Sequence, residues 1–391
     1  MMKYLVIISA LFISLNAGAQ GINFFEGSMD ALKAEAAKNN KIIFIDCYTS
    51  WCGPCKWLAK NVFTNTQVGK YYNSHFINYS LDMEKGEGKN IQKQYNILAY
   101  PTLLFIDAKG EMQHRYVGAC DTSTFIAVGK QALDTTNNFG SLLKRYHRGE
   151  RNPDFLAKYA LNCISVYYPY DIQEYFATQA DSQLISPVNF EIMKRYRINV
   201  TSREYQYVIS HIDTFIKKYN FMNLYEFVTS TMTRTLYSQS SAKDFNLEKQ
   251  IDTYLQPVQS KEKEFWKNAF IMDYYSFYKI RKEQAFLEQA SILLNLAKEQ
   301  FHPYLEYVIT IVTNFASEIS DTLLLKKFVD IINPYTILLS AESQLKMANI
   351  YINLQNKTAA EEMLNKAKIH IKNEDMQKEY DKLVSTCKLL K

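Results

Sequence analysis

Two cysteines with a spacing suited to redox chemistry stand near the start of the chain. Cys52 and Cys55 are separated by Gly53 and Pro54 and follow an apolar run at 41–48, which predicts a strand buried on both faces. The residues after the cysteines predict a helix. In this strand–helix context a C-x-x-C motif indicates a thiol–disulfide pair.

The predicted helix gives the two thiols different roles. Its N-terminus directs unpaired N–H groups and a partial positive charge at the Cys52 sulfur, which favours the thiolate. Cys52 is therefore expected to attack a partner disulfide, and Cys55, one turn further along, to resolve the mixed disulfide. Pro54 suits the first helical turn, and Lys56 adds a nearby cation.

The remaining cysteines raise the alternative of a metal site. Cys47, Cys52, Cys55 and Cys120 match the spacing of a plant-type 2Fe–2S cluster. Cys47, however, follows Asp46 on a strand, so the two side chains point to opposite faces and only one can face the motif. An iron–sulfur cluster and a zinc site are both disfavoured, no metal or cofactor is expected, and Cys47 is predicted to be a core thiol. The sequence leaves open how the cysteines outside the motif pair: Cys47, Cys120, Cys163 and Cys387.

Composition divides the chain into two regions. All 12 glycines lie in the first 149 residues, whereas 20 of the 29 tyrosines lie in residues 150–391. A long stretch without glycine and with few prolines excludes turn-rich β architectures and favours helices. The net charge is +5, from 45 basic and 40 acidic residues, and no segment concentrates positive charge. Nucleic acid is therefore not an expected partner.

Residues 1–19 predict a secretory signal peptide. Lys3 precedes the apolar run 4–15, and small residues stand at Ala17 and Ala19. The apolar run is too short to span about 30 Å of hydrocarbon. We therefore expect cleavage after Ala19 and a soluble periplasmic or secreted protein without membrane insertion. Export would place the thiols in a compartment where disulfides persist.

Alternating strand and helix patterns predict a compact α/β domain at 20–137. The expected helix N-caps include Ser28, Asn65 and either Asp121 or Thr122. Asparagine, glycine and proline residues make 138–153 an expected linker. The expected strands cover 41–48, 76–83, 102–107 and 111–117.

Residues 154–391 predict an all-α region with tyrosine and phenylalanine in its core. Residues 341–374 resemble one tetratricopeptide hairpin. No second clear copy follows, so an irregular helical superhelix is expected rather than a regular array. The residues at the packing positions of that hairpin are Ala348, Tyr351, Ala360, Leu364 and Ala367.

Residues 41–135, about a quarter of the chain, resemble the thioredoxin superfamily. The block Val62–Asn65 with Val68 further resembles periplasmic thioredoxin-like reductase domains of the disulfide-interchange type. The resemblance implies a thioredoxin-like α/β fold for this part of the chain. The residues that carry it, in family order, are Asp46, Trp51–Lys56, Tyr100–Thr102, Lys109–Glu111 and Val117–Gly118.

The resemblance also implies roles around the cysteine pair. Asp46 is then a buried carboxylate beneath the site, with a raised pKa that lets it accept the Cys55 proton. Pro101 is then a cis-proline beside Cys52, where a substrate strand can pair. Gly118 would keep the neighbouring strand clear. The remaining implied site residues are Trp51, Gly53, Pro54, Lys56 and Tyr100.

Three features depart from the family pattern. Asn78 replaces a lysine that is often found near the buried carboxylate. An insert of six residues, 83–88, is expected to be a mobile polar loop. The bulky Tyr100 is expected to shape partner choice.

Two functional hypotheses follow. The first is an exported protein-disulfide reductase that acts on disulfide-bearing client proteins. Because such a reductase needs electrons in an oxidising compartment, it implies a membrane electron donor. The second is a helical scaffold that uses a thioredoxin-like docking module, and the sequence favours the first.

Overall fold

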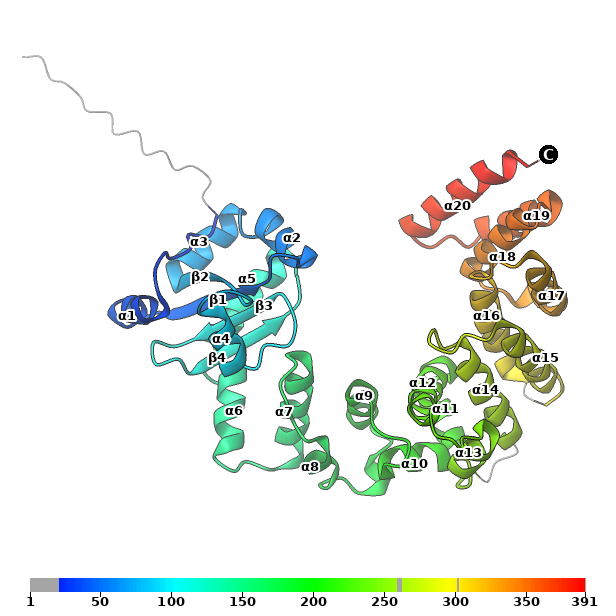
Figure 1. Ribbon diagram of the computed structural model, residues 1–391, viewed down its shortest axis with the longest axis horizontal. Coiled ribbons are helices and arrows are strands. Elements are labelled where there is room, and N and C mark those ends of the chain that lie inside the picture. Colours follow the sequence, from blue (N-terminus) through cyan, green and yellow to red (C-terminus); the bar gives the residue numbers. More distant parts are fainter. Residues whose placement is uncertain (1–20, 259–261, 301, 391) are drawn as a thin grey trace, which may run out of the picture. The chain divides into compact units, whose positions relative to one another are not determined.

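The computed structural model describes residues 21–258, 262–300 and 302–390. These residues form two compact units, divided between Gln179 and Ala180 (Figure 1). The predicted signal peptide lies outside the described residues. Each unit is described below by itself.

A four-stranded mixed sheet forms the centre of the first unit, in the order β2-β1-β3-β4. β1 pairs in parallel with β2 and antiparallel with β3, and β3 pairs antiparallel with β4. This register places Ser80 of β2 directly beside Asp46 of β1. The strand bounds are β1 Ile42–Tyr48, β2 Phe76–Asp82, β3 Thr102–Ile106 and β4 Met112–Val117.

Helices cover both faces of the sheet. On one face, α1 and α4 pack with Ile43, Ile45 and Cys47 of β1, and on the other face α2, α3 and α5 pack with Phe44. Successive β1 side chains thus enter opposite cores, as the period of a strand requires. Cys47 is a core thiol, as predicted. The helix bounds are α1 Met29–Asn39, α2 Gly53–Asn61, α3 Thr66–His75, α4 Gly88–Gln94 and α5 Thr122–Leu133.

The predicted N-caps begin their helices by the expected mechanism. The Ser28 hydroxyl accepts from the backbone N–H of Ala31, and the Asn65 side chain accepts from the N–H groups of two residues in the first turn. Asp121, rather than Thr122, caps α5 and accepts from Thr124. Each cap satisfies backbone donors that the helix itself leaves unpaired.

The segment expected to be a linker, 138–153, contains a helix instead. α6 covers Phe139–His147, begins at the N-cap Asn138, and packs on β4. The approach is close: a Cβ added to Gly140 would lie 2.2 Å from the backbone oxygen of Met112. A glycine at this position predicts a turn, but here it allows a helix to approach a strand.

A buried histidine anchors the start of α6. The backbone N–H of Phe139 donates to Nδ1 of His114 on β4 at 3.3 Å. Burial lowers the pKa of His114 to about 4, so the imidazole is neutral and able to accept at neutral pH. This buried hydrogen bond therefore joins the start of α6 to the sheet.

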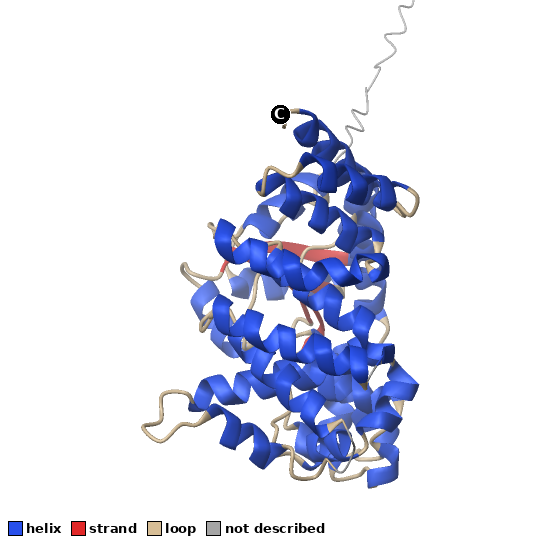
Figure 2. Ribbon diagram, turned by 90° about the vertical axis from the view of Figure 1, so that its right-hand side faces the viewer, coloured by secondary structure: helices blue, strands red, loops and turns tan. Residues whose placement is uncertain are grey.

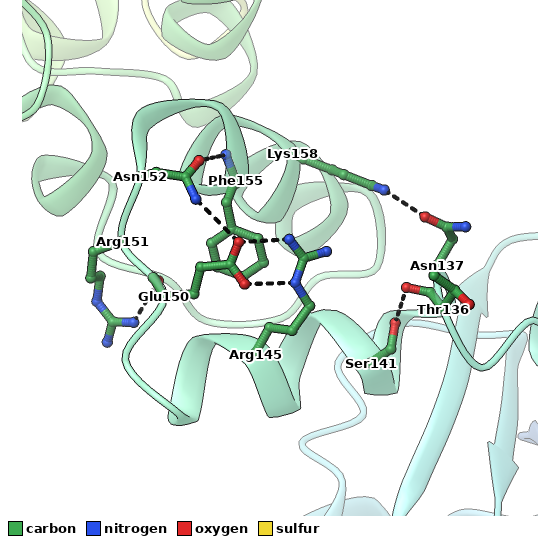
Figure 3. Close-up of polar contacts among 9 residues, drawn as sticks. All are labelled: Thr136, Asn137, Ser141, Arg145, Glu150, Arg151, Asn152, Phe155 and Lys158. Atoms are coloured by element: carbon green, nitrogen blue, oxygen red, sulfur yellow. Dashed lines mark hydrogen bonds and ion pairs between the residues drawn. The ribbon is translucent and has the colours of Figure 1, made fainter.

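Polar contacts join α6, the helix α7, Pro153–Ser165, and the loops before each of them (Figure 3). The Arg145 guanidinium makes two hydrogen bonds of 2.7 Å with the Glu150 carboxylate and lies over the Phe155 ring. Lys158 of α7 reaches back to Asn137 at 2.9 Å. With the short helix α8, Ile172–Phe176, these helices extend the first unit to residue 179.

The described residues of the second unit form helices joined by loops and turns (Figure 2). Helices adjacent in sequence pack on one another, as in the pairs α14–α15, α15–α16 and α18–α19. The α helices of this unit are α9 Pro187–Tyr196, α10 Arg203–Ser210, α11 Ile212–Tyr219, α12 Phe221–Gln239, α13 Leu247–Tyr254, α14 Lys263–Ser276, α15 Glu283–Glu299, α16 Leu305–Ala316, α17 Thr322–Ile332, α18 Ala341–Asn353, α19 Lys357–Lys368 and α20 Glu374–Lys388. Short 3-10 helices are η1 Asp181–Gln183, η2 His302–Tyr304 and η3 Asn333–Leu338.

Aromatic side chains fill the interior of the helical unit, as the sequence predicted. Trp266 of α14 is fully buried and lies 5.7 Å from Phe221 of α12, and Phe286 of α15 stacks on Phe315 of α16 at 3.8 Å between ring centroids. Helices α18 and α19 form the hairpin expected at 341–374. The five packing residues proposed there are all buried.

Candidate active site

The cysteine pair stands at the start of α2 and forms a disulfide, with 5.3 Å between the two Cα atoms. Cys52 is the N-cap of α2, and its sulfur accepts from the backbone N–H of Cys55 at 3.1 Å. Pro54 occupies the first turn, where its missing N–H costs nothing. In the reduced state the same N–H and the helix dipole would favour a thiolate at Cys52. Cys52 and Cys55 are only 4% and 6% exposed.

Asp46 lies near the C-terminal end of β1 and is 5% exposed. The Ser80 hydroxyl donates to its Oδ2 at 3.0 Å, whereas its Oδ1 has no hydrogen-bond partner among the described residues. Burial raises the pKa of Asp46 to about 7, and the Ser80 hydrogen bond opposes this rise without cancelling it. The carboxyl group can therefore gain or lose a proton near neutral pH.

Asp46 and Cys55 line one cavity of about 290 Å³. Its walls also include Ser80, Tyr48 and Lys56. A volume of this size can hold several water molecules, each of which needs roughly 30 Å³. The cavity thus provides a path along which a proton can pass between the Cys55 sulfur and the Asp46 carboxylate through water.

The loop before β3 brings Pro101 and Gly118 together. The Tyr100–Pro101 peptide bond is cis, and the Gly118 N–H donates to the Pro101 carbonyl at 2.9 Å. Gly118 has φ of 108°, which side-chain-bearing residues rarely adopt. A Cβ at Gly118 would meet nothing within 4 Å, so the backbone angle rather than crowding requires glycine here.

A buried arginine holds the segment that leads into this loop. Arg115 of β4 is 1% exposed and donates to the carbonyls of Tyr95 and Asn96, at 2.9 and 3.1 Å. These carbonyls end α4 and would otherwise be unpaired inside the protein. Arg115 thereby fixes the segment that leads to Pro101. No motif in the sequence indicated this role.

Trp51 is 65% exposed beside Cys52, but its ring is held in place. Its indole N–H donates to the Glu84 carboxylate at 3.0 Å, and its ring meets the edge of Tyr100 at 6.1 Å. Gln92 of α4 donates to the Tyr100 hydroxyl at 2.7 Å. Neither Glu84 nor Gln92 was identified from the sequence, because each acts across a loop.

The structure shows the surroundings of two of these departures. The Asn78 side chain donates to Asn73 and Asn23, whereas Ser80, two residues further along β2, contacts Asp46. Hydrogen bonds connect the loop 83–88 to the rest of the fold. The Met83 N–H donates to the Tyr48 carbonyl at 2.8 Å, and Glu84 binds Trp51.

The cysteines outside the motif are buried and unreactive in character. Burial raises the pKa of Cys120 to about 11 and that of Cys163 to about 12, and raises the pKa of Cys47 well above its ordinary value. Cys387, also buried, is a free thiol like the other three. The described part of the chain contains no cluster of three or more histidine, cysteine or carboxylate side chains arranged to hold a metal ion.

Known proteins share the sequence pattern of this site. Residues 29–133 match the family model of a thioredoxin-like domain. An H-type thioredoxin of Oryza sativa subsp. indica is 36% identical over 90 residues, which cover 23% of this chain and 68% of that protein. The chain belongs to the thioredoxin family.

Longer relatives share only this part. The thiol:disulfide interchange protein DsbD of Haemophilus ducreyi is 34% identical over 95 residues, which cover 23% of this chain but 16% of that protein. The match to the DsbD of Pseudoalteromonas atlantica likewise spans 19% of the relative's length. A solution structure of a putative disulphide-isomerase from Bacteroides thetaiotaomicron is 45% identical and is covered over 98% of its length, 30% of this chain, with a TM-score of 0.29.

The relatives named thioredoxin and thiol:disulfide interchange protein place the Cys52–Cys55 pair in a family of thiol–disulfide oxidoreductases. Over the described ranges, no helix is both long enough and apolar enough to cross a membrane.

Proposed function

We propose that this protein is an exported thiol–disulfide oxidoreductase that reduces disulfides of partner proteins through Cys52 and Cys55. The observation that carries the proposal is the shared cavity of Asp46 and Cys55, directly behind a cysteine pair at a helix N-terminus. A purely structural disulfide has no use for a carboxylate that titrates near pH 7 beside it.

The reaction begins from the reduced pair. The Cys52 thiolate attacks one sulfur of the partner disulfide, and the second partner sulfur leaves as a thiolate that takes a proton from water. Asp46 then accepts the Cys55 proton through the cavity, and the Cys55 thiolate attacks the Cys52 sulfur. The Cys52–Cys55 disulfide forms, and the released partner sulfur leaves as a thiolate that takes a proton from water, while Asp46 returns its proton to water. The partner leaves with two thiols, and two electrons have passed to it.

A dithiol reductant must then restore the pair. The Gly53–Pro54 sequence between the cysteines is that of thioredoxin, whose reduction potential of about −270 mV favours reduction of partners, against about −120 mV for a strong periplasmic oxidant. The predicted signal peptide supports a site of action in the periplasm or outside the cell. A membrane protein that carries a reactive dithiol would be the electron donor there.

The residues around the pair have corresponding roles. Tyr100, Pro101 and Gly118 offer backbone and ring surface to an extended partner segment beside Cys52. Trp51 borders the attacking sulfur, and Lys56 adds positive charge to the cavity wall. No cofactor takes part in this mechanism.

A trapping experiment tests the proposal. The Cys55→Ser variant should accumulate mixed disulfides with partner proteins, because the resolving thiol is absent, and reduction of the sample should release them. Cys52→Ser is the matched control and should trap nothing. The wild-type protein should also reduce insulin and equilibrate with glutathione.

Failure of the Cys55→Ser variant to trap any partner, together with inactivity towards insulin, would contradict the reductase. Recovery of the same partners with Cys52→Ser as with the wild-type protein would instead support the scaffold hypothesis.

A further inference from the structure

The loop 83–88 lies beside the cysteine pair, yet the exchange reaction described above makes no use of it. The Met83 N–H donates to the Tyr48 carbonyl, at the end of the strand that carries Asp46. Further along the loop, the Glu87 carboxylate accepts from the N–H of Met29 at 3.0 Å. Between these two anchors, Glu84 directs its carboxylate at the exposed indole of Trp51. The loop is therefore fixed where a partner of Cys52 must approach.

Glu84 and Gln92 together hold an aromatic pair. Glu84 fixes the indole N–H of Trp51, Gln92 fixes the Tyr100 hydroxyl, and the two rings meet edge to face with an interplanar angle of 83°. A large aromatic surface that is already fixed loses little conformational entropy when a partner covers it. Such preorganised aromatic side chains characterise the energetically dominant positions of protein interfaces.

Glu84 also brings a negative charge to this surface. Its carboxylate has no lysine, arginine or histidine within ion-pair distance among the residues that the structure describes, whereas the neighbouring Asp82 is paired with Lys85 at 2.9 Å. The Glu84 charge is felt at Tyr100, where it contributes, after burial, to a raised pKa. The Glu84 charge also acts on Lys85, which is paired with Asp82. A cation in the partner would therefore find next to Trp51 a carboxylate that the neighbouring lysine offsets only from a distance.

We propose that Glu84 is the positioning and specificity-determining residue for protein partners: it holds Trp51 against Tyr100 and favours partners with a lysine or arginine beside their disulfide. The inference rests on the proposed function. It extends that function from exchange chemistry to the choice between partners.

Two peptides test the charge. Each contains one intramolecular disulfide, and they differ only in a Lys or a Glu before the first cysteine. The wild-type protein should reduce the Lys peptide with a kcat/KM about threefold higher at low salt, the size expected for one exposed charge pair. Added salt should remove the preference, since exposed charges are screened.

Two substitutions separate the two roles. In Glu84→Gln the amide oxygen can still accept from Trp51, so the preference should vanish while the mean KM of the two peptides stays near the wild-type value. In Glu84→Ala the indole is released as well, and KM should rise severalfold for both peptides with little change in kcat. Glu26→Gln, which removes an exposed carboxylate outside the site, is the control and should keep the wild-type preference.

Two outcomes overturn the inference: a Lys preference that persists in Glu84→Gln, or equal rates for both peptides in the wild-type protein. If Glu84→Ala lowered kcat for both peptides and left KM unchanged, the positioning role would also be wrong. A wild-type protein that reduced neither peptide would refute the proposed function itself, which distinguishes the two failures.

Discussion

The chain changes direction by different means in the α/β part of the protein and in the helical unit. The first 149 residues hold all 12 glycines, and several of them adopt positive φ or lie against another backbone segment. The helical unit has no glycine, and its left-handed corners are made by Arg197, Asn220, Arg281 and Gln355. The prolines of this unit stand at helix boundaries rather than at these corners: Pro187 begins α9, and Pro334 lies in the 3-10 helix between α17 and α18.

The difference shows what each part requires of its residues. Around the cysteine pair the backbone itself forms the site, at the Pro101 carbonyl, at Gly118 and at the N–H groups of α2, so backbone angles and close approaches are constrained. In the helical unit the packing of aromatic side chains determines the structure, and corners tolerate a modest backbone cost. Substitutions should therefore affect the two parts differently.

The largest expected effect concerns a buried charge next to the site. Asp46→Asn should stabilise the protein above pH 7 by roughly 4 kcal/mol, since about 3 pKa units separate the folded and unfolded states. With a folded pKa raised to about 7, the contribution of Asp46 to stability is fully present below pH 3.8 and is lost as pH rises to 7. Denaturant titrations at pH 5 and pH 9 measure the difference.

Asp273→Asn is the matched variant in the helical unit. Burial also raises the pKa of Asp273, and Thr233 donates to it at 2.5 Å, but no cysteine is part of this arrangement. Asp46→Asn should slow the resolution of mixed disulfides, whereas Asp273→Asn should leave that rate unchanged. If mixed disulfides were resolved at equal rates in the two variants, Asp46 would have no role in the mechanism.

A smaller effect is expected where helix α6 approaches β4. Gly140→Ala should lower the free energy of unfolding by about 1–3 kcal/mol, because the added methyl group meets the backbone of Met112 and Gln113. Gly53→Ala is the control, since a Cβ there meets nothing within 4 Å, and its stability should change little. A Gly140→Ala variant as stable as the wild-type protein would show that α6 does not pack as described.

The smallest effect should have the opposite sign and lie in the helical unit. Gln355→Gly should raise the free energy of unfolding by roughly 0.5–1 kcal/mol, because Gln355 is exposed and has φ of 58°. Glu361→Gly, at an exposed position inside α19, should lower it by about 1 kcal/mol. Thermal unfolding of both variants measures whether the first is more stable and the second less stable than the wild-type protein.

Features encoded over short stretches were predictable from the sequence. The cysteine motif, the strand that carries Asp46, and the caps Ser28 and Asn65 each depend on a few consecutive residues. The partner of Asp46 was not predictable, because choosing Ser80 over Asn78 requires the exact register of two parallel strands. Contacts such as Glu84 with Trp51 depend on how a loop folds back, which no local pattern encodes.

Helix α6 was missed for a different reason. Phe139, Leu142 and Leu143 have helical spacing and follow a good N-cap, Asn138, so a local signal was present. Gly140 and Gly149 oppose this pattern, because glycine by its type indicates a turn. The left-handed corners at Arg197 and Gln355 gave no signal at all, because their side chains do not favour that conformation.

The hydrogen bond between Phe139 and His114 limits where the redox domain can be cut from the rest of the chain. A fragment cut at the end of the family match, residue 133, would leave the imidazole without its donor and expose the side of β4 that α6 covers. Such a fragment would be prone to associate through the exposed strand. The portable module of this protein is therefore residues 21–179, a redox domain that carries three further helices, α6, α7 and α8.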